Sequence, residues 1–404
     1  MTVRCKKLFE KLERIEFLSS DENSRAVHHY AFDNVVCVGE NLFYPNVKLL
    51  SISSKEVHEP LEERVMSLLL ADEESVVDFD ESYDRVVESP VFFFIYNTDN
   101  YYHFLYDSLP HVYSYLSIRE KVPETRLLMS YPNSSKPSHY KFVIEALDLL
   151  GIPEESIEIV TERTLYRRIY VSSSYTHGKD SNTPPRKEVH ELLQSMGQST
   201  EINLPRKIYV SRRSWLHGDY SNIGTDYTSR RRMVNENKLV ESLKSFGIVE
   251  VFTETLSTKE KIQLFREADV IVGSIGGGMA NCLFSRPDTK VVVIVSPTFL
   301  DVNARFKHCF DSVKVTYATN CSHVESSSLK KYMRVKAIDG RVGEIVEIHN
   351  DTATVMFAAN KVAGWSKSMQ YEETEIHTSS LTPLDGGLNS EWESDVEEIL
   401  RALR

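Results

Sequence analysis

The sequence predicts an α/β protein with two doubly wound, Rossmann-like domains, followed by a small β-barrel and a closing helix. At 404 residues the chain is longer than one hydrophobic core usually serves. Strand-like and helix-like runs alternate along residues 91–194 and again along 207–295, which is typical of largely parallel sheets. Beyond residue 329 the pattern changes to short β-rich runs separated by turn residues.

These patterns predict four segments. They are a Rossmann-like domain at 1–200, a second at 201–328, an SH3-like or KOW-like barrel at 329–385 and a C-terminal helix at 386–404. Helical spacing of apolar residues in the last segment begins at Trp392. One arrangement left open is that this helix crosses back to the first domain.

The first clear secondary-structure signal of the first domain is VFFFIY, residues 91–96, a run typical of a buried strand. A helix with Pro110 as a possible kink is predicted at 102–118. The elements predicted after it are a strand at 126–129, a helix at 138–150 ended by Gly151, strands at 157–160 and 165–171, and a helix at 185–194.

The second domain has the clearest alternation of strands and helices. Its predicted strands are 207–211, 249–253, 270–273 and 291–295. Its predicted helices are 236–246 with Asn235 as N-cap, 257–267 with a capping box from Ser257 to Glu260, and one that starts near Met279. Four strands with three helices are half of a nucleotide-binding fold.

Charge and cysteine usage exclude several kinds of partner. The net charge of -12 argues against a broad surface for duplex DNA or an anionic membrane, so no nucleic-acid partner is expected. The five cysteines are scattered without a CxxC pair, which favours reduced thiols over disulfides or zinc. The N-terminal residues lack the apolar stretch of a signal peptide or membrane span, so we expect a cytoplasmic protein.

Two residues in the first domain suit proton transfer. His103 and Asp107 are four positions apart, so they share one face of the predicted helix, just after a strand. Either Asp107 is a general base, or it orients His103 as the base. The alternative is a solvated aspartate and a buried structural histidine.

A second group of residues suits an anionic ligand. Arg212 and Arg213 follow the first strand of the second domain, and Arg232 lies just before a helix. An arginine fork at the carboxyl ends of parallel strands suits a diphosphate. Arg230 and Arg231 read as solvent-exposed residues. The alternative for any one of these arginines is a surface residue that pairs with an acidic side chain and binds no ligand.

A glycine-rich turn completes the predicted phosphate site. Gly276, Gly277 and Gly278 lie between a strand and a helix, where backbone N–H groups can approach a phosphate. A tight strand-to-helix turn without a ligand is the alternative. The neighbouring residues predicted to help bind the nucleotide are Asn235, Glu254, Leu256, Ser257, Ser274 and Asn281.

Four clusters together resemble glycosyltransferase family 61, over roughly residues 90–300. Residues 100–107 (NYYHFLYD) are similar to the family's N-x-x-H-F-x-x-D element, and residues 211–213 and 232–236 to its S-R and R-x-x-N-E pair. Residues 256–268 resemble the helix before its glycine loop, and 272–281 (VGSIGGGMAN) resemble G-x-H-G-A-G-x-x-N. The family's histidine is Ile275 here and its alanine is Gly277, so the histidine's role cannot be transferred.

The resemblance implies a GT-B fold, in which two Rossmann-like domains face a cleft. It also implies an inverting, metal-independent transferase without a prosthetic group. The donor would be a UDP-sugar in the second domain, with UDP-xylose ahead of UDP-GlcNAc. The acceptor would be an oligosaccharide or glycoprotein in the first domain.

Two other functions remain open at this stage. A non-catalytic glycan- or protein-binding module could retain the same fold, since the family histidine is missing. A metal-dependent glycosyltransferase could use Asp78-Phe79-Asp80 as its carboxylate pair, although an acid-rich stretch of this kind is more often a solvated loop.

Overall fold

The computed structural model describes ten longer stretches and several short ones, which fall into two compact units. One unit comprises residues 1–198 with 257–259, and the other 199–256 with 260–404. The described residues are 13–18, 27–37, 83–94, 98, 100–129, 131, 138–160, 162, 164–172, 174–176, 184–197, 204–213, 231–324, 328–358, 371–384 and 388–404. Among them, no helix has the length and apolar character needed to cross a membrane.

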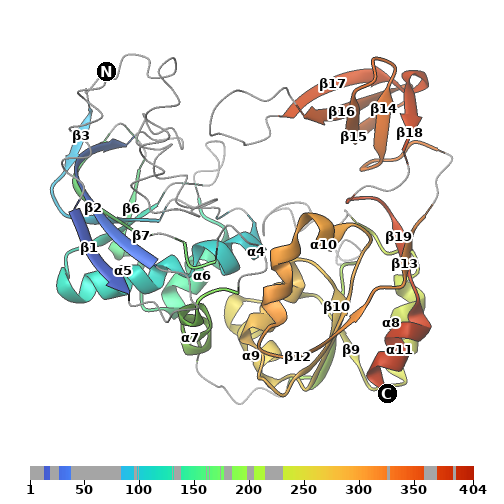
Figure 1. The fold of residues 1–404 in the computed structure, drawn as a ribbon, viewed down its shortest axis with the longest axis horizontal. Helices are drawn as coiled ribbons and strands as arrows, with labels where there is room; N and C mark the ends of the chain where they lie inside the picture. Colours follow the sequence, from blue (N-terminus) through green and yellow to red (C-terminus); the bar gives the residue numbers. More distant parts are fainter. Residues whose placement is uncertain are drawn as a thin grey trace. The chain divides into compact units, whose positions relative to one another are not determined.

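The first unit is built on a seven-stranded mixed sheet in the order β1-β2-β7-β4-β5-β6, with β3 also paired to β7 (Figure 1). Strands β3 to β7 run parallel, whereas β1 and β2 are antiparallel additions at one edge. The strands are β1 (Glu13–Leu18), β2 (Val27–Cys37), β3 (Arg85–Val87), β4 (Val91–Phe93), β5 (Arg126–Met129), β6 (Ile157–Ile159) and β7 (Thr164–Ser172).

The helical stretch after β4 is interrupted, as the proline within it suggested. It consists of α4 (Tyr101–His103), a π-helical turn η1 (Phe104–Ser108) and α5 (His111–Lys121). Pro110 lacks an N–H group, so it cannot continue a regular hydrogen-bond ladder. The unit's other helical segments are α6 (Lys141–Leu149), η2 (Glu154–Ser156) and α7 (Lys187–Ser195). Gly151 follows α6 with a φ of 72°, which confirms its predicted role in ending that helix.

The second unit contains a parallel five-stranded sheet in the order β12-β11-β10-β8-β9. Its strands are β8 (Lys207–Val210), β9 (Val249–Val251), β10 (Val270–Ser274), β11 (Lys290–Ile294) and β12 (Lys314–Ala318). The first four confirm the predicted strands. The fifth, β12, was missed because it is a sheet edge whose residues alternate between exposed and half-buried rather than forming an apolar run.

Helical segments connect the strands of this sheet. They are α8 (Glu236–Lys244), η5 (Thr253–Thr255), α9 (Thr258–Glu267), η6 (Gly277–Phe284), α10 (Phe299–Val302) and η7 (Ala304–Phe310). The helix expected near Met279 is therefore the 3-10 segment η6, and it starts two residues earlier, at Gly277. Its apolar residues, including Met279, are buried.

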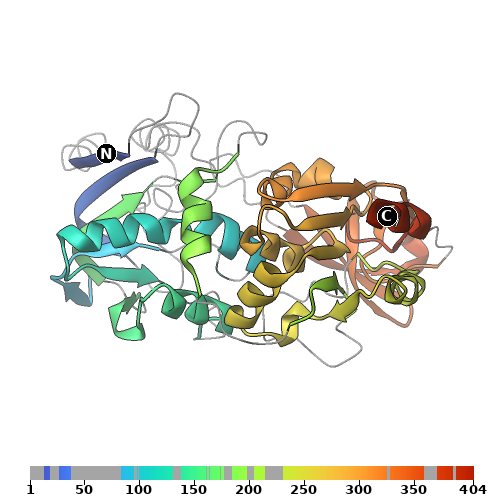
Figure 2. The same cartoon turned by 90° about the horizontal axis from the view of Figure 1, so that it is seen from below.

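The C-terminal segment completes the core of the second unit. Strand β19 (Trp392–Ser394) pairs with β13 (Cys321–His323), and α11 (Val396–Leu403) packs against α8, β11 and β12 (Figures 1 and 2). Ile399 and Leu400 lie in the same apolar cluster as Tyr209. The arrangement in which this helix crosses back to the first domain is therefore wrong, and Trp392 belongs to a strand rather than to the helix.

Residues 334–383 form a separate five-stranded antiparallel sheet in the order β17-β16-β15-β14-β18. Its elements are β14 (Arg334–Ala337), β15 (Val342–His349), β16 (Thr352–Ala358), β17 (Tyr371–His377), η8 (Thr378–Ser380) and β18 (Leu381–Pro383). Val335, Ile345 and Val355 are fully buried in its apolar core. The predicted β-rich runs are thus strands.

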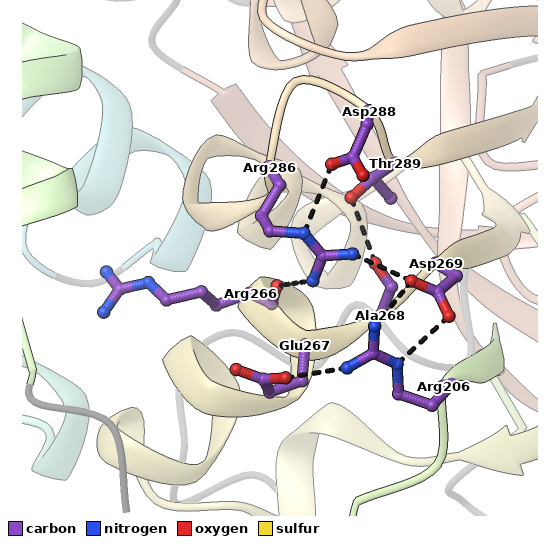
Figure 3. A network of polar contacts seen from close by, with 8 residues as sticks. All are labelled: Arg206, Arg266, Glu267, Ala268, Asp269, Arg286, Asp288 and Thr289. Atoms are coloured by element: carbon purple, nitrogen blue, oxygen red, sulfur yellow. Dashed lines mark hydrogen bonds and ion pairs between the residues drawn. The ribbon is translucent and has the colours of Figure 1, made fainter.

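A network of ion pairs fixes the amino-terminal edge of the second sheet (Figure 3). Arg206, just before β8, holds the Asp269 carboxylate through two hydrogen bonds of 3.0 and 2.8 Å, and Arg286 reaches the same carboxylate at 2.8 Å. The Arg206 guanidinium holds the pKa of Asp269 below its usual range. Thr289 donates to the Ala268 carbonyl at 3.0 Å. Side chains at this edge bind one another, and open α/β sheets generally bind ligands at the opposite edge, beyond the carboxyl ends of the strands.

Candidate functional site

Asp107 and His103 form a hydrogen-bonded pair in the first unit. His103 Nδ1 lies 2.7 Å from Asp107 Oδ2, and Thr176 donates its hydroxyl to Asp107 Oδ1 at 2.9 Å. Because a carboxylate only accepts hydrogen bonds, Nδ1 carries the ring proton and Nε2 is left as the basic atom. The Asp107 side chain is 7% exposed and that of His103 34% exposed. The histidine is therefore the member of the pair that a substrate can reach.

The local backbone explains why these two side chains meet. Asn100 caps the start of α4 by accepting a hydrogen bond from the His103 N–H at 3.2 Å. The π-helical turn that follows is closed by the Leu109 N–H on the Phe104 carbonyl at 2.7 Å. Such turns widen a helix and often occur at functional sites. The prediction that His103 and Asp107 share a helix face is confirmed.

Sheet topology brings the third member, Thr176, to the same place. From β4 the chain proceeds to β5 and β6 on one side, and then returns to place β7 on the other side of β4. The carboxyl ends of β4 and β7 are therefore neighbours at a switch point, where open α/β sheets bind ligands. His103 and Asp107 follow β4, and Thr176 follows β7.

Buried hydrogen bonds hold the segment that carries Thr176. The hydroxyls of Tyr175 and Ser114 lie 2.6 Å apart, and Ser114 Oγ lies 2.6 Å from His29 Nε2. Burial raises the pKa of Tyr175, so its hydroxyl keeps its proton. Because Tyr175 is anchored in the core, its neighbour Thr176 has little freedom to leave Asp107.

The second unit has its own switch point, between β8 and β10. Strand β9 lies on one side of β8, and β10, β11 and β12 follow on the other. Arg212 leaves the carboxyl end of β8, and Gly276 follows the carboxyl end of β10. A Cβ atom on Gly276 would collide with Arg212 Nη1. The missing side chain thus lets the guanidinium lie directly against the glycine turn.

Glu236 fixes the position of Arg212. Its Oε1 accepts hydrogen bonds from the Tyr209 hydroxyl at 2.8 Å, the Ser211 hydroxyl at 3.0 Å and the Arg212 backbone N–H at 3.1 Å. Burial lowers the pKa of the Arg212 guanidinium, whereas Glu236 and Glu254 act in the opposite direction. The guanidinium stays charged. Glu236 closed the R-x-x-N-E pattern, but sequence reasoning gave it no role of its own.

The three glycines have different surroundings. A Cβ on Gly278 would lie 3.0 Å from both Thr253 Oγ1 and Val210 Cγ1, whereas one on Gly277 would meet nothing within 4 Å. Asn281 donates to the Gly278 carbonyl at 2.8 Å and is fully buried. A side chain at 276 would therefore displace the Arg212 guanidinium, and close packing favours glycine at 278, while position 277 has room for the alanine of the resembling family.

Glu254 brings a buried carboxyl to the carboxyl end of β9. Burial raises the pKa of Glu254, while Arg212 and Lys261 act to lower it. No hydrogen-bond partner for its Oε2 occurs among the described residues. Ionised carboxylates and sugar hydroxyls form strong hydrogen bonds, so a ribose is a suitable partner for this group.

Two predicted site residues contact other parts of the protein. Arg213 is bound by both carboxylate oxygens of Glu250, at 2.6 and 2.7 Å, and also contacts Asn237. The side chain of Arg232 is 51% exposed and lies 3.7 Å from Glu391. The structure does not bring either of them to the glycine turn as it does Arg212.

Asn235 is not the side-chain N-cap of α8 that the sequence predicted. Its side chain makes no capping hydrogen bond. Instead, Nδ2 donates to the Ser394 carbonyl at 2.7 Å, and Oδ1 accepts from the Ser394 N–H at 3.2 Å. A partner 159 positions later in the chain thus replaces the local cap.

Arg231, predicted to be solvent-exposed, is half-buried next to the glycine turn. Its Nη2 lies 3.9 Å from the place that a Cβ on Gly276 would occupy. Its guanidinium carbon lies 4.6 Å from the centre of the Phe299 ring, which is within cation–π range. The sequence pattern pointed to Arg232 instead, and nothing in it distinguished Arg231 from Arg230.

The remaining predicted residues lie around the same edge. Ser274 is buried at the end of β10, and Ile275 is 1% exposed, so the latter side chain belongs to the core rather than to a ligand site. Leu256 and Ser257 are half-buried between η5 and α9. Asp78, Phe79 and Asp80 lie outside the described residues. Within the described part of the chain, no group of three metal-ligating side chains is found.

Comparison with protein families agrees with this geometry. Residues 101–292 match the model of the family described as Glycosyltransferase 61. A search of the curated protein sequences found no match. The matched region contains the His103–Asp107 pair, Arg212 and the glycine turn. By this match residues 101–292 belong to glycosyltransferase family 61.

Proposed function

We propose that the protein transfers a sugar from a UDP-sugar to a glycan hydroxyl with inversion, without a metal ion. Family membership supports a glycosyltransferase that uses a nucleotide-sugar donor and a glycan acceptor. The observation that carries the finer proposal is the contact between Arg212 and Gly276 at the switch point of the second sheet. A half-buried cation and the backbone of the glycine turn meet there, and together they suit a diphosphate.

In this proposal the second unit binds the donor. Arg212 and the turn at 276–278 bind the diphosphate, and Glu254 accepts a hydrogen bond from the ribose. Thr253 and Asn281 pack around the turn and keep its shape. The diphosphate is the leaving group, so charge that develops on it during transfer is stabilised by Arg212 and by the N–H dipoles.

The first unit supplies the base. His103 Nε2 takes the proton from the acceptor hydroxyl while that oxygen forms a bond to the anomeric carbon of the donor sugar. The bond from this carbon to the diphosphate oxygen breaks with its electron pair, and UDP leaves. Asp107 keeps the histidine ring oriented and stabilises the positive charge that the ring acquires. Direct attack from the opposite face inverts the anomeric centre.

The donor sugar we propose first is xylose, with GlcNAc second. The acceptor is an oligosaccharide or glycoprotein. A panel of UDP-, GDP- and CMP-sugars tests the donor, because a ligand that binds the native state raises the melting temperature. Only UDP-sugars should do so, and UDP-xylose should raise it most. Stabilisation by GDP- or CMP-sugars alone would exclude the proposed donor.

Two alternative functions make different predictions. A glycan- or protein-binding module would bind acceptor without binding UDP or releasing it from a donor. A metal-dependent enzyme that uses Asp78 and Asp80 would lose its activity in EDTA, and Mn²⁺ or Mg²⁺ would restore it. We expect UDP release in the presence of acceptor, at a rate that EDTA leaves unchanged.

A further inference from the structure

We infer that Arg231 is a second binding group for the donor diphosphate, and that Trp392 near the C-terminus positions it. This inference rests on the proposed function, because it adds a contact to the same nucleotide site. It assigns a role in donor binding to a C-terminal strand that lies beyond the family match, which ends at residue 292.

The side chain of Arg231 places a second cation beside the glycine turn, next to Arg212. The Arg212 guanidinium lies against Gly276. Arg231 Nη2 lies 3.9 Å from the position that a Cβ atom on Gly276 would occupy. The Phe299 ring lies under the guanidinium carbon at 4.6 Å and restricts its movement. Two guanidinium groups beside one glycine turn fit a ligand with two phosphates better than a neutral ligand.

The backbone of Arg231 is held in an unusual conformation by the C-terminal segment. Its φ is 54°, in the left-handed region, which costs a non-glycine residue about 1 kcal/mol. Its N–H donates to the Asn389 carbonyl at 3.0 Å, and its carbonyl accepts from Trp392 Nε1 at 2.8 Å. These two hydrogen bonds tie both sides of the residue to one short segment and hold the conformation.

Trp392 is itself rigidly anchored. It is 1% exposed, and it packs in the apolar cluster with Tyr209, Leu239 and Ile399. Its backbone N–H donates to the Arg232 carbonyl at 3.0 Å, and its carbonyl accepts from the Val234 N–H at 2.8 Å. The indole therefore links the core of the sheet to Arg231, and it is a positioning residue that acts through that arginine.

Three variants test the inference with UDP as the probe. Arg231→Gly removes the guanidinium but suits the left-handed backbone. Trp392→Phe keeps an aromatic ring in the core but removes the N–H donor. In Glu398→Ala, the matched control, α11 loses its contacts with the N–H groups of Thr319 and Asn320 without touching Arg231.

We expect Arg231→Gly to raise the Kd for UDP about tenfold, as loss of a charge-assisted hydrogen bond does. Trp392→Phe should raise it about threefold to tenfold, and Glu398→Ala should leave it unchanged. The double variant that combines Arg231→Gly with Trp392→Phe should bind UDP no more weakly than Arg231→Gly alone, because the two changes remove the same contact. Uridine, which has no phosphate, should bind all variants like the wild type in ligand-observed NMR.

Specific results would overturn the inference. Unchanged UDP binding in Arg231→Gly, while Arg212→Ala weakens it, would exclude Arg231 but leave the proposed function intact. Independent effects in the double variant, or equal loss of UDP and uridine in Trp392→Phe, would exclude positioning by Trp392. If Trp392→Phe does not fold, its benzothienylalanine isostere provides the same test, because sulfur replaces only the N–H group. A wild type that binds no UDP would contradict both proposals.

Discussion

His103 Nδ1 and Asp107 Oδ2 lie 2.7 Å apart, and the second carboxylate oxygen of Asp107 accepts a hydrogen bond from Thr176. Both oxygens are therefore used inside the protein. The sequence left open which of the two residues is the base. This geometry favours His103, with Asp107 as the group that orients it.

The first prediction concerns Asp107→Asn. The amide cannot stabilise a positively charged imidazole as the carboxylate does, so turnover should fall by about a hundredfold or more. UDP binding belongs to the other unit and should be unchanged. Transfer assays and calorimetry on the same preparation check both points. Full activity in this variant would remove Asp107 from the mechanism.

The second prediction concerns Thr176, which sequence reasoning did not select. Thr176→Val removes the hydroxyl on Asp107 Oδ1 and preserves the shape of the side chain, so kcat should fall about tenfold. Thr176→Ser retains the hydroxyl and serves as the control. A steady-state comparison in which both variants match the wild type would show that the orientation of Asp107 does not depend on this contact.

The third prediction uses two adjacent glycines as a matched pair. Gly276→Ala places a methyl group on Arg212 Nη1, so the guanidinium must move and UDP should bind at least tenfold more weakly. Gly277→Ala points into open space and should bind UDP normally. Equal Kd values for the two variants would mean that Arg212 does not depend on its contact with position 276.

The fourth prediction concerns pH and the stability of the first unit. Burial lowers the pKa of His139 from 6.5 to about 4. Between these pH values the histidine is protonated in the unfolded chain but neutral in the folded protein. Stability is therefore lost as the pH falls from 6.5 towards 4, by up to about 3 kcal/mol. His139→Phe should lose less over that interval. Urea unfolding at pH 7.5, 5.5 and 4.5 measures the difference, and identical pH profiles would contradict it.

Much of the second sheet could be predicted because its signals are local. An apolar run such as 291–295 indicates a buried parallel strand, and three glycines after a strand indicate a close approach of backbone and ligand. The positions of Arg212 and of the glycine turn then follow from topology. Both leave the carboxyl ends of neighbouring strands, and this relationship needs no knowledge of side-chain contacts.

The residues that were misjudged depend on distant parts of the chain. Asn235 has the right position for an N-cap, yet its side chain pairs with Ser394. The sequence pattern selected Arg232 rather than Arg231, but hydrogen bonds to Asn389 and Trp392 hold Arg231 in its left-handed conformation. Interactions across more than 150 positions are invisible to local patterns.

Calorimetric titration of UDP into the wild type and the Arg212→Ala, Arg213→Ala and Arg232→Ala variants tests the central claim most directly. Arg212→Ala should bind UDP at least tenfold more weakly. Arg213→Ala should leave the Kd for UDP nearly unchanged, because Glu250 already binds the Arg213 side chain. Arg232→Ala should raise the Kd by an intermediate amount, because the Arg232 side chain is half-exposed. Equal affinity of Arg212→Ala and the wild type, or no UDP binding by the wild type, would contradict a diphosphate site at the glycine turn.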